Sequence, residues 1–240
     1  MWPSTPETLA AEQRRLGALE TDPWAPPGGP LVVAGCFICF GSISEQEGPA
    51  AERAWAAAVL LRGRRLLGTR VVEGVTECAY QPGLLALREG HLLTGVLLEL
   101  GTRPDVVMIN ATGRDHPRRA GLALHIGALL DVATVGVTDR PLIATGEAPH
   151  GDRGTRAPLR VDGDVVAGWV VSRPGTRPVV VHAAWRTTPD TAVDIVMRCV
   201  RRARTPEPIR RARRAARLAR ATARAGGTKA LDMGNGECSP

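Results

Sequence analysis

Apolar segments typical of β-strands alternate with segments typical of α-helices along most of the chain. The strand-like runs are rich in Val, Leu, Ile and Ala and cover residues 31–40, 55–61, 66–75, 106–110, 134–137, 165–172 and 179–183. Helices are expected at residues 83–100, 117–130 and 189–202, the last with Thr188 as N-cap and Pro189 at its first position. This alternation favours an α/β fold in which helices cover both faces of a mixed sheet.

The expected organisation is one main domain with short extensions at both ends. At 240 residues and 44% hydrophobic content, the chain is long enough to bury a large core. Residues 1–30 predict a short helix around 7–19 and a Pro/Gly-rich lead-in, and residues 31–205 form the main domain. Residues 206–227 predict an Arg-rich helix that starts near Pro208 and ends near Gly226-Gly227, and residues 228–240 are expected to be a disordered tail.

The positive charge is concentrated at the C-terminal end. The formal net charge is +7, and residues 201–240 contain ten arginines and Lys229 against three acidic residues, so the rest of the chain is nearly neutral. Nucleic acid is therefore an expected partner only through the Arg-rich stretch 209–224, and a solvated helix is the alternative. No run of 18 apolar residues is present, so we expect no membrane span, and the N-terminus does not resemble a signal peptide, which predicts a cytoplasmic protein.

Three motif blocks occur in the middle of the chain. Residues 80–90 read YQPGLLALREG, residues 104–110 read PDVVMIN, and residues 116–127 read HPRRAGLALHIG. Together they resemble endonuclease V, a family that nicks DNA or RNA near inosine, and the resemblance implies a ribonuclease H-like fold. It extends from the strand at 31–40 to the stretch at 202–210 and so covers most of the chain.

The resemblance also implies a divalent metal held by two aspartates and a glutamate. The glutamate corresponds to Glu89, but the aspartate of the first strand corresponds to Phe37 and the aspartate of the third block to Asn110. Magnesium sites rely on carboxylates together with substrate phosphates, so one carboxylate and one amide make a poor site. We therefore expect no metal and no other cofactor, and metal-dependent cleavage of a phosphodiester is unexpected.

Two more positions depart from the family pattern. The family lysine that contacts the scissile phosphate corresponds to Asp139, so a cation has become an anion. The family's Ser-Pro-Gly-His stretch corresponds to His182-Ala183-Ala184-Trp185. Substitutions concentrated at the reacting centre indicate an altered function.

The candidate site combines what remains of the family pattern with these departures. The candidate catalytic residues are Asp139, Glu89 and His116, and the candidate substrate-binding residues are Tyr80, Gly83, Asn110, Arg118 and Trp185. Asp139 or Glu89 would be the general base, and His116 with Arg118 would hold an anionic group.

These residues favour a metal-independent enzyme that acts on a small anionic substrate. Expulsion of sulfate or phosphate from carbon, by base-assisted ring closure or elimination in specialised metabolism, requires no metal. One alternative is a pseudoenzyme subunit that completes a partner protein, with Phe37 and Phe40 as packing or interface residues. Others are a nucleic-acid-binding protein and a residual inosine-specific endonuclease.

Overall fold

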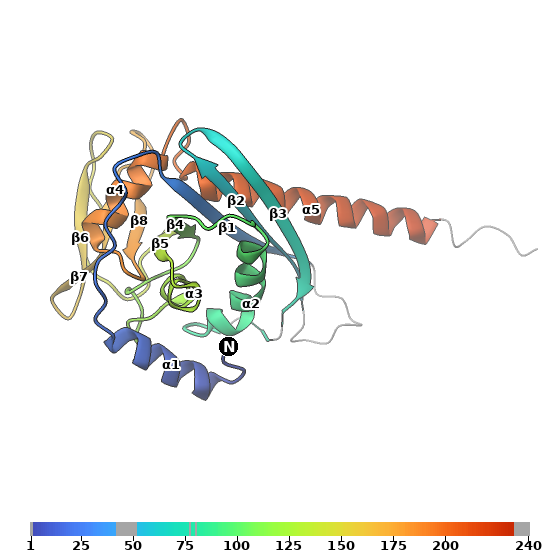
Figure 1. The fold of residues 1–240 in the computed structure, drawn as a ribbon, viewed down its shortest axis with the longest axis horizontal. Coiled ribbons are helices and arrows are strands. Elements are labelled where there is room, and N and C mark those ends of the chain that lie inside the picture. Colours follow the sequence, from blue (N-terminus) through green and yellow to red (C-terminus); the bar gives the residue numbers. More distant parts are fainter. Residues whose placement is uncertain (1, 42–51, 77, 80, 233–240) are drawn as a thin grey trace, which may run out of the picture.

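A computed structural model describes residues 2–41, 52–76, 78–79 and 81–232 of the chain (Figure 1). Within this part, eight strands form one mixed sheet in the order β3-β2-β1-β4-β5-β8-β7-β6. The strands are β1 (Val32–Phe40), β2 (Arg53–Arg62), β3 (Arg65–Val75), β4 (Val106–Ile109), β5 (Ala133–Thr138), β6 (Arg156–Val161), β7 (Asp164–Val170) and β8 (Val179–Ala183). The central strands β1, β4 and β5 are parallel, so their C-terminal ends meet at one edge of the sheet.

Helices cover both faces of the sheet, as the sequence predicts (Figure 1). One face packs against α1 (Pro6–Ala18), α2 (Leu85–Leu98) and α3 (Leu122–Leu130). The other packs against α4 (Pro189–Cys199) and the first half of α5 (Glu207–Asp232). The side chains of β1 alternate between these faces, because successive residues of a strand point to opposite sides.

Strand β6 was not predicted from the sequence. Its Pro158 weakened the strand pattern, but proline is tolerated in a strand at the edge of a sheet, which is where β6 lies. Asp162 and Gly163 join β6 to β7, and both have positive φ angles of 51° and 89°, as a tight hairpin turn requires.

Helices α3 and α5 differ most in length from their predictions, while α2 and α4 are shorter than expected by four and three residues. Helix α3 begins at Leu122 and not at Pro117, because Arg119 has a φ of 58° and Gly121 is the N-cap. Helix α5 continues to Asp232, so it runs through Gly226-Gly227 and overlaps the start of the expected disordered tail. The rest of that tail, residues 233–240, lies outside the described residues.

The start of α5 lies directly against β1. A Cβ atom at Gly35 would be 2.3 Å from the carbonyl carbon of Pro208, so only glycine allows this approach. Ile209, Ala212 and Ala216 of this helix are fully buried, and Ala219 is partly buried. The remainder of α5 projects beyond β2 and β3 (Figure 1). None of the helices in the described part of the chain is long and apolar enough to cross a membrane.

Candidate functional site

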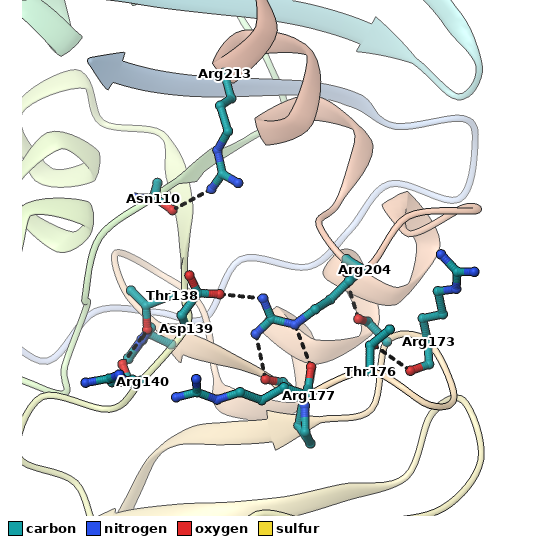
Figure 2. Close-up of polar contacts among 12 residues, drawn as sticks. Asn110, Thr138, Asp139, Arg140, Arg173, Thr176, Arg177, Arg204 and Arg213 are labelled. Atoms are coloured by element: carbon teal, nitrogen blue, oxygen red, sulfur yellow. Dashed lines mark hydrogen bonds and ion pairs between the residues drawn. The ribbon is translucent and has the colours of Figure 1, made fainter. Parts of the chain in front are cut away.

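An arginine from α5 lies at the adjoining ends of β1 and β4. The parallel register pairs Cys36 with Ile109, which places the next residues, Phe37 and Asn110, side by side. The guanidinium of Arg213 lies over the Phe37 ring, with Cζ 4.9 Å from the ring centroid. Its Nη2 is 3.5 Å from Asn110 Oδ1, a long contact that Figure 2 shows. A cation therefore lies between the two positions where the resemblance implies metal-binding aspartates.

Glu89 is an isolated carboxyl group on α2. It is 8% exposed, and its carboxylate makes no hydrogen bond to any other described residue. Burial raises its pKa to about 7, against the opposing charge of Arg88. That arginine is engaged elsewhere, because it forms an ion pair with Glu52 and lies over the Phe40 ring. Glu89 is thus partly protonated near neutral pH.

These donors do not fit a divalent metal. Within the described ranges, no three His, Cys, Asp or Glu side chains lie close enough together to hold a metal ion. Glu89 supplies a single carboxylate, and Asn110 supplies a neutral amide oxygen. The guanidinium of Arg213 lies beside that oxygen and would repel a cation. A site of this composition lacks the carboxylates that hold magnesium.

Asp139, at the end of β5, forms an ion pair across the same edge of the sheet. Its Oδ1 accepts a hydrogen bond of 2.5 Å from Arg204 Nη1, and Arg204 also donates to the carbonyls of Arg177 and Pro178 (Figure 2). The hydrogen bond from Arg204 lowers the pKa of Asp139, and the charges of Arg204, Arg213 and Arg177 lower it further. Asp139 is therefore ionised and a weak proton acceptor.

His116 and Arg118 converge on the backbone of Gly83. The Gly83 carbonyl accepts hydrogen bonds from Arg118 Nη2 at 3.0 Å and from His116 Nε2 at 3.3 Å. Arg118 Nε also donates to Gln13 Oε1 at 2.7 Å, which ties this loop to α1. Burial lowers the pKa of His116 to about 4, helped by the charge of Arg118, so the imidazole is neutral at neutral pH.

A cavity of about 180 Å³ lies beside this cluster. Its lining includes three of the predicted residues, Gly83, Asn110 and His116. The other lining residues are Gln13, Leu85, Ala86, Ala111, Thr112, Leu122, Thr138 and Leu142. Three candidate residues from separate parts of the chain therefore line one cavity.

Other predicted residues lie elsewhere. Glu89 and Asp139 do not line the cavity. Trp185 packs against α3, so closely that a Cβ at Gly127 would lie 2.3 Å from the Cβ of Trp185. The buried Nε1 of Trp185 has no hydrogen-bond partner among the described residues. Tyr80 lies outside the described residues.

Several residues at the site were not predicted from the sequence. Gln13, Arg204 and Thr138 carry no local motif that marks them. Arg213 belongs to a helix that stands out in the sequence only for its charge, and its position against β1 follows from the fold. The alternation of arginine with buried alanine in this helix is the one signal in the sequence that some arginines face the sheet.

Comparisons with known proteins agree with this fold and with the motif blocks. The profile of the endonuclease V family matches residues 29–214. Endonuclease V from Rhodospirillum centenum is 35% identical over 239 residues, which cover 96% of this chain and 95% of that protein. The crystal structure of endonuclease V from Streptomyces avermitilis is 31% identical, covers 92% of this chain and 96% of its own, and superposes with a TM-score of 0.81.

A third relative has been crystallised with nucleic acid. Endonuclease V from Ciona intestinalis, in complex with a 24mer DNA containing an inosine followed by a ribo-adenosine, is 22% identical and has a TM-score of 0.72. The match covers 88% of this chain and 96% of that one, and the two proteins share a fold. The extent of the family match, together with these relatives, shows that this chain belongs to the endonuclease V family.

Proposed function

We propose that this chain is a metal-independent enzyme that acts on a small anionic molecule and has lost the metal-dependent nuclease chemistry implied by its family. The observation that carries the proposal is the position of Arg213 between Phe37 and Asn110. A guanidinium supplies positive charge where a metal would supply it, and it binds sulfate or phosphate oxygens through paired N–H groups.

Arg213 has hydrogen-bonding capacity left for such a ligand. Its Nε is buried and has no partner among the described residues, and its contact with Asn110 is long. The long contact leaves Nη2 able to donate to an anion instead, and a charge-assisted hydrogen bond of normal length would bind that anion with a gain in free energy. Asn110 also lines the cavity, so we expect the anionic group of a bound molecule at that end of the cavity.

Glu89 suits the role of general base better than Asp139. Its pKa of about 7 is near the working pH, whereas the ion pair with Arg204 keeps the pKa of Asp139 low. Ala86 lines the cavity, and Glu89 follows it by one helical turn on the same side of α2. We assign Asp139 the role of holding Arg204 at this edge of the sheet.

The proposed reaction is an intramolecular substitution or elimination. A nucleophilic atom or a C–H group of the substrate loses its proton to Glu89 through one bridging water, because Glu89 lies beyond the residues that line the cavity. The bond between carbon and the oxygen of a sulfate or phosphate breaks, and its electron pair leaves with the oxyanion, which Arg213 stabilises. The neutral His116 and Arg118 keep the Gly83 loop at the cavity. A biosynthetic role in specialised metabolism would supply a substrate of this kind.

The partner-subunit alternative has less support. It predicts that Phe37 and Phe40 take part in an interface. Both rings are partly buried, and each is covered by a guanidinium of this same chain, from Arg213 and Arg88 respectively.

Isothermal titration calorimetry with inorganic sulfate tests the proposal. The wild type should bind sulfate, and Arg213→Met should weaken the binding by about tenfold or more, since a hydrogen bond to a charged group contributes about 1.5–3 kcal/mol. Arg214→Met is the matched control, because Arg214 is exposed on the same helix and should leave binding unchanged. Equal affinities in the wild type and Arg213→Met would contradict the proposal.

Nucleic-acid docking through α5 is a second candidate function, favoured by the projection of this helix from the body (Figure 1). Arg214, Arg217 and Arg224 are exposed along it. If they bind phosphates, the triple substitution of these residues by Gln should reduce the slope of log K against log salt by about 0.9 for each phosphate that is no longer neutralised. An unchanged slope would exclude this role for the three side chains.

A further inference from the structure

A row of three polar side chains leads from the protein interior to the cavity. His182 Nε2 lies 2.7 Å from Thr138 Oγ1, and His182 Nδ1 lies 3.5 Å from Asp115 Oδ2. Asp115 and His182 are fully buried, whereas Thr138 lines the cavity. We propose that Asp115, His182 and Thr138 form a proton relay through which a molecule bound in the cavity gives up a proton. This inference rests on the proposed function and adds a second proton acceptor on the side of the cavity formed by β5.

The pairing of β5 with β8 sets the position of the histidine ring. These strands are antiparallel, and His182 lies opposite Gly136. A Cβ at Gly136 would be 3.2 Å from His182 Cβ and 2.2 Å from the carbonyl oxygen of Ala111, so the glycine keeps this region open. The ring therefore reaches along β5 to the hydroxyl of Thr138 at the end of the strand.

Asp115 is held firmly at the inner end of the row. Its carboxylate accepts backbone N–H groups from Leu142 at 2.7 Å, Ile143 at 2.9 Å and Ala144 at 2.8 Å. These bonds fix the orientation of the carboxylate, and Oδ2 faces the histidine ring. Asp115 is thus a positioning residue that does not touch the cavity.

Protonation of His182 would put its positive charge beside the carboxylate of Asp115. In the structure the buried Nδ1 has no hydrogen-bond partner among the described residues. With protons on both nitrogens, Nδ1 faces Asp115, Nε2 donates to Thr138 Oγ1, and the hydroxyl donates to the carbonyl of Arg140 at 2.7 Å. Every polar group then has a partner of opposite character.

Burial keeps the histidine neutral at rest. It lowers the pKa of His182 to about 4, and the charge of Asp115 acts in the opposite direction. A neutral imidazole with its proton on Nδ1, towards Asp115, leaves Nε2 able to accept the Thr138 proton once that hydroxyl turns away from the carbonyl of Arg140. The same arrangement of carboxylate, imidazole and hydroxyl activates hydroxyl groups in hydrolases.

The proton transfers balance without a covalent bond to the protein. A nucleophilic O–H or N–H group on the β5 side of the cavity passes its proton to Thr138 Oγ1, which takes the place of Glu89 as acceptor, while the hydroxyl proton of Thr138 moves to His182 Nε2. The electron pair left on the substrate atom forms the new bond that displaces the leaving group. The imidazolium is stabilised by Asp115 until the proton returns to solvent by the same route.

Proton exchange of the His182 ring, measured by NMR on protein labelled with ¹⁵N-histidine, tests the relay without any substrate. A buried ring connected to the cavity through Thr138 should exchange its N–H with water at least about tenfold faster than an equally buried ring with no such connection. His125 is the internal control, because it is 3% exposed and stacks on Trp2 away from the cavity.

Variants of Thr138 distinguish the relay from simple packing. Thr138→Val, which keeps the shape and removes the hydroxyl, should slow the exchange of His182 to the rate of His125, and Thr138→Ser should preserve fast exchange. Arg213→Met should leave the exchange unchanged, so failure of the sulfate experiment and failure of the relay are separate results. Exchange of His182 that is as slow as that of His125 in the wild type, or unaffected by Thr138→Val, would overturn the relay.

Discussion

Glu89→Gln should stabilise the protein at high pH and not at low pH. Glu89 is 8% exposed, and burial raises the pKa of its carboxyl group from 4.5 to about 7. A carboxyl group whose pKa is raised by folding contributes its full stability below the unfolded value of 4.5 and loses it as the pH rises through about 7. At 1.36 kcal/mol per pKa unit, the charged form costs about 3 kcal/mol of stability at about pH 8.

Urea unfolding at a series of pH values measures this cost. The difference in unfolding free energy between Glu89→Gln and the wild type should be small near pH 4 and should rise to about 3 kcal/mol near pH 8. The buried histidines titrate in both proteins, so their contribution cancels in the difference. Glu99→Gln, at an exposed position at the end of the same helix, is the control and should show no such rise.

The same experiment tests whether a metal ion binds beside Glu89. Without a metal to neutralise Glu89, millimolar magnesium should leave the difference at pH 8 unchanged. A difference that stays constant from pH 4 to pH 8, or one that magnesium abolishes, would refute the conclusion that Glu89 is a buried carboxyl group without a metal partner.

Three further predictions concern stability. Gly35→Ala should destabilise the protein by about 1–3 kcal/mol, because the new Cβ would lie 2.3 Å from the backbone of Pro208. Gly95→Ala, in open space on α2, should stabilise the protein by up to about 1 kcal/mol, and urea unfolding measures both changes. Truncation after Thr205 should lower the melting temperature sharply because it removes the buried Ile209, and truncation after Ala225 should leave it nearly unchanged. A melting temperature that truncation after Thr205 does not lower would show that α5 is not part of the core. Magnesium or manganese should not raise the melting temperature of the wild type, and a saturable stabilisation at millimolar concentration would argue for a metal site.

Much of the fold could be predicted because its patterns are local. The apolar runs predict most strands, and the helix signals around Pro189 and Pro208 predict α4 and the start of α5. The edge strand β6 was missed because Pro158 and two arginines, Arg156 and Arg160, obscured its pattern, although Asp162-Gly163 marked its turn. Helix α5 continues through two glycines because the Arg- and Ala-rich sequence around them favours a helix.

The candidate site could be predicted only where motifs mark it. The resemblance located Gly83, Asn110 and His116, which line one cavity in the structure. It could not reveal the contact of Arg213 with Asn110 or the pairing of Arg204 with Asp139, since both join residues far apart in sequence.

The surroundings of the other site residues also depend on tertiary structure and not on local sequence. The row formed by Asp115, His182 and Thr138 depends on the register between β5 and β8, for which no residue pattern gives a signal. Trp185 was chosen as a substrate-binding candidate because of its place in the family pattern. In the structure it packs against α3.

Cleavage of inosine-containing nucleic acid is the most direct test of the proposed loss of metal-dependent chemistry. Single- and double-stranded DNA and RNA substrates would be incubated with the protein and magnesium or manganese, beside an active endonuclease V as control. No cleavage by this chain is expected under any of these conditions, because Phe37 and Asn110 stand where the resemblance implies aspartates and the guanidinium of Arg213 contacts both. Robust nicking that Glu89→Ala abolishes would show that the family chemistry persists and would contradict the assignment of Arg213 as its replacement.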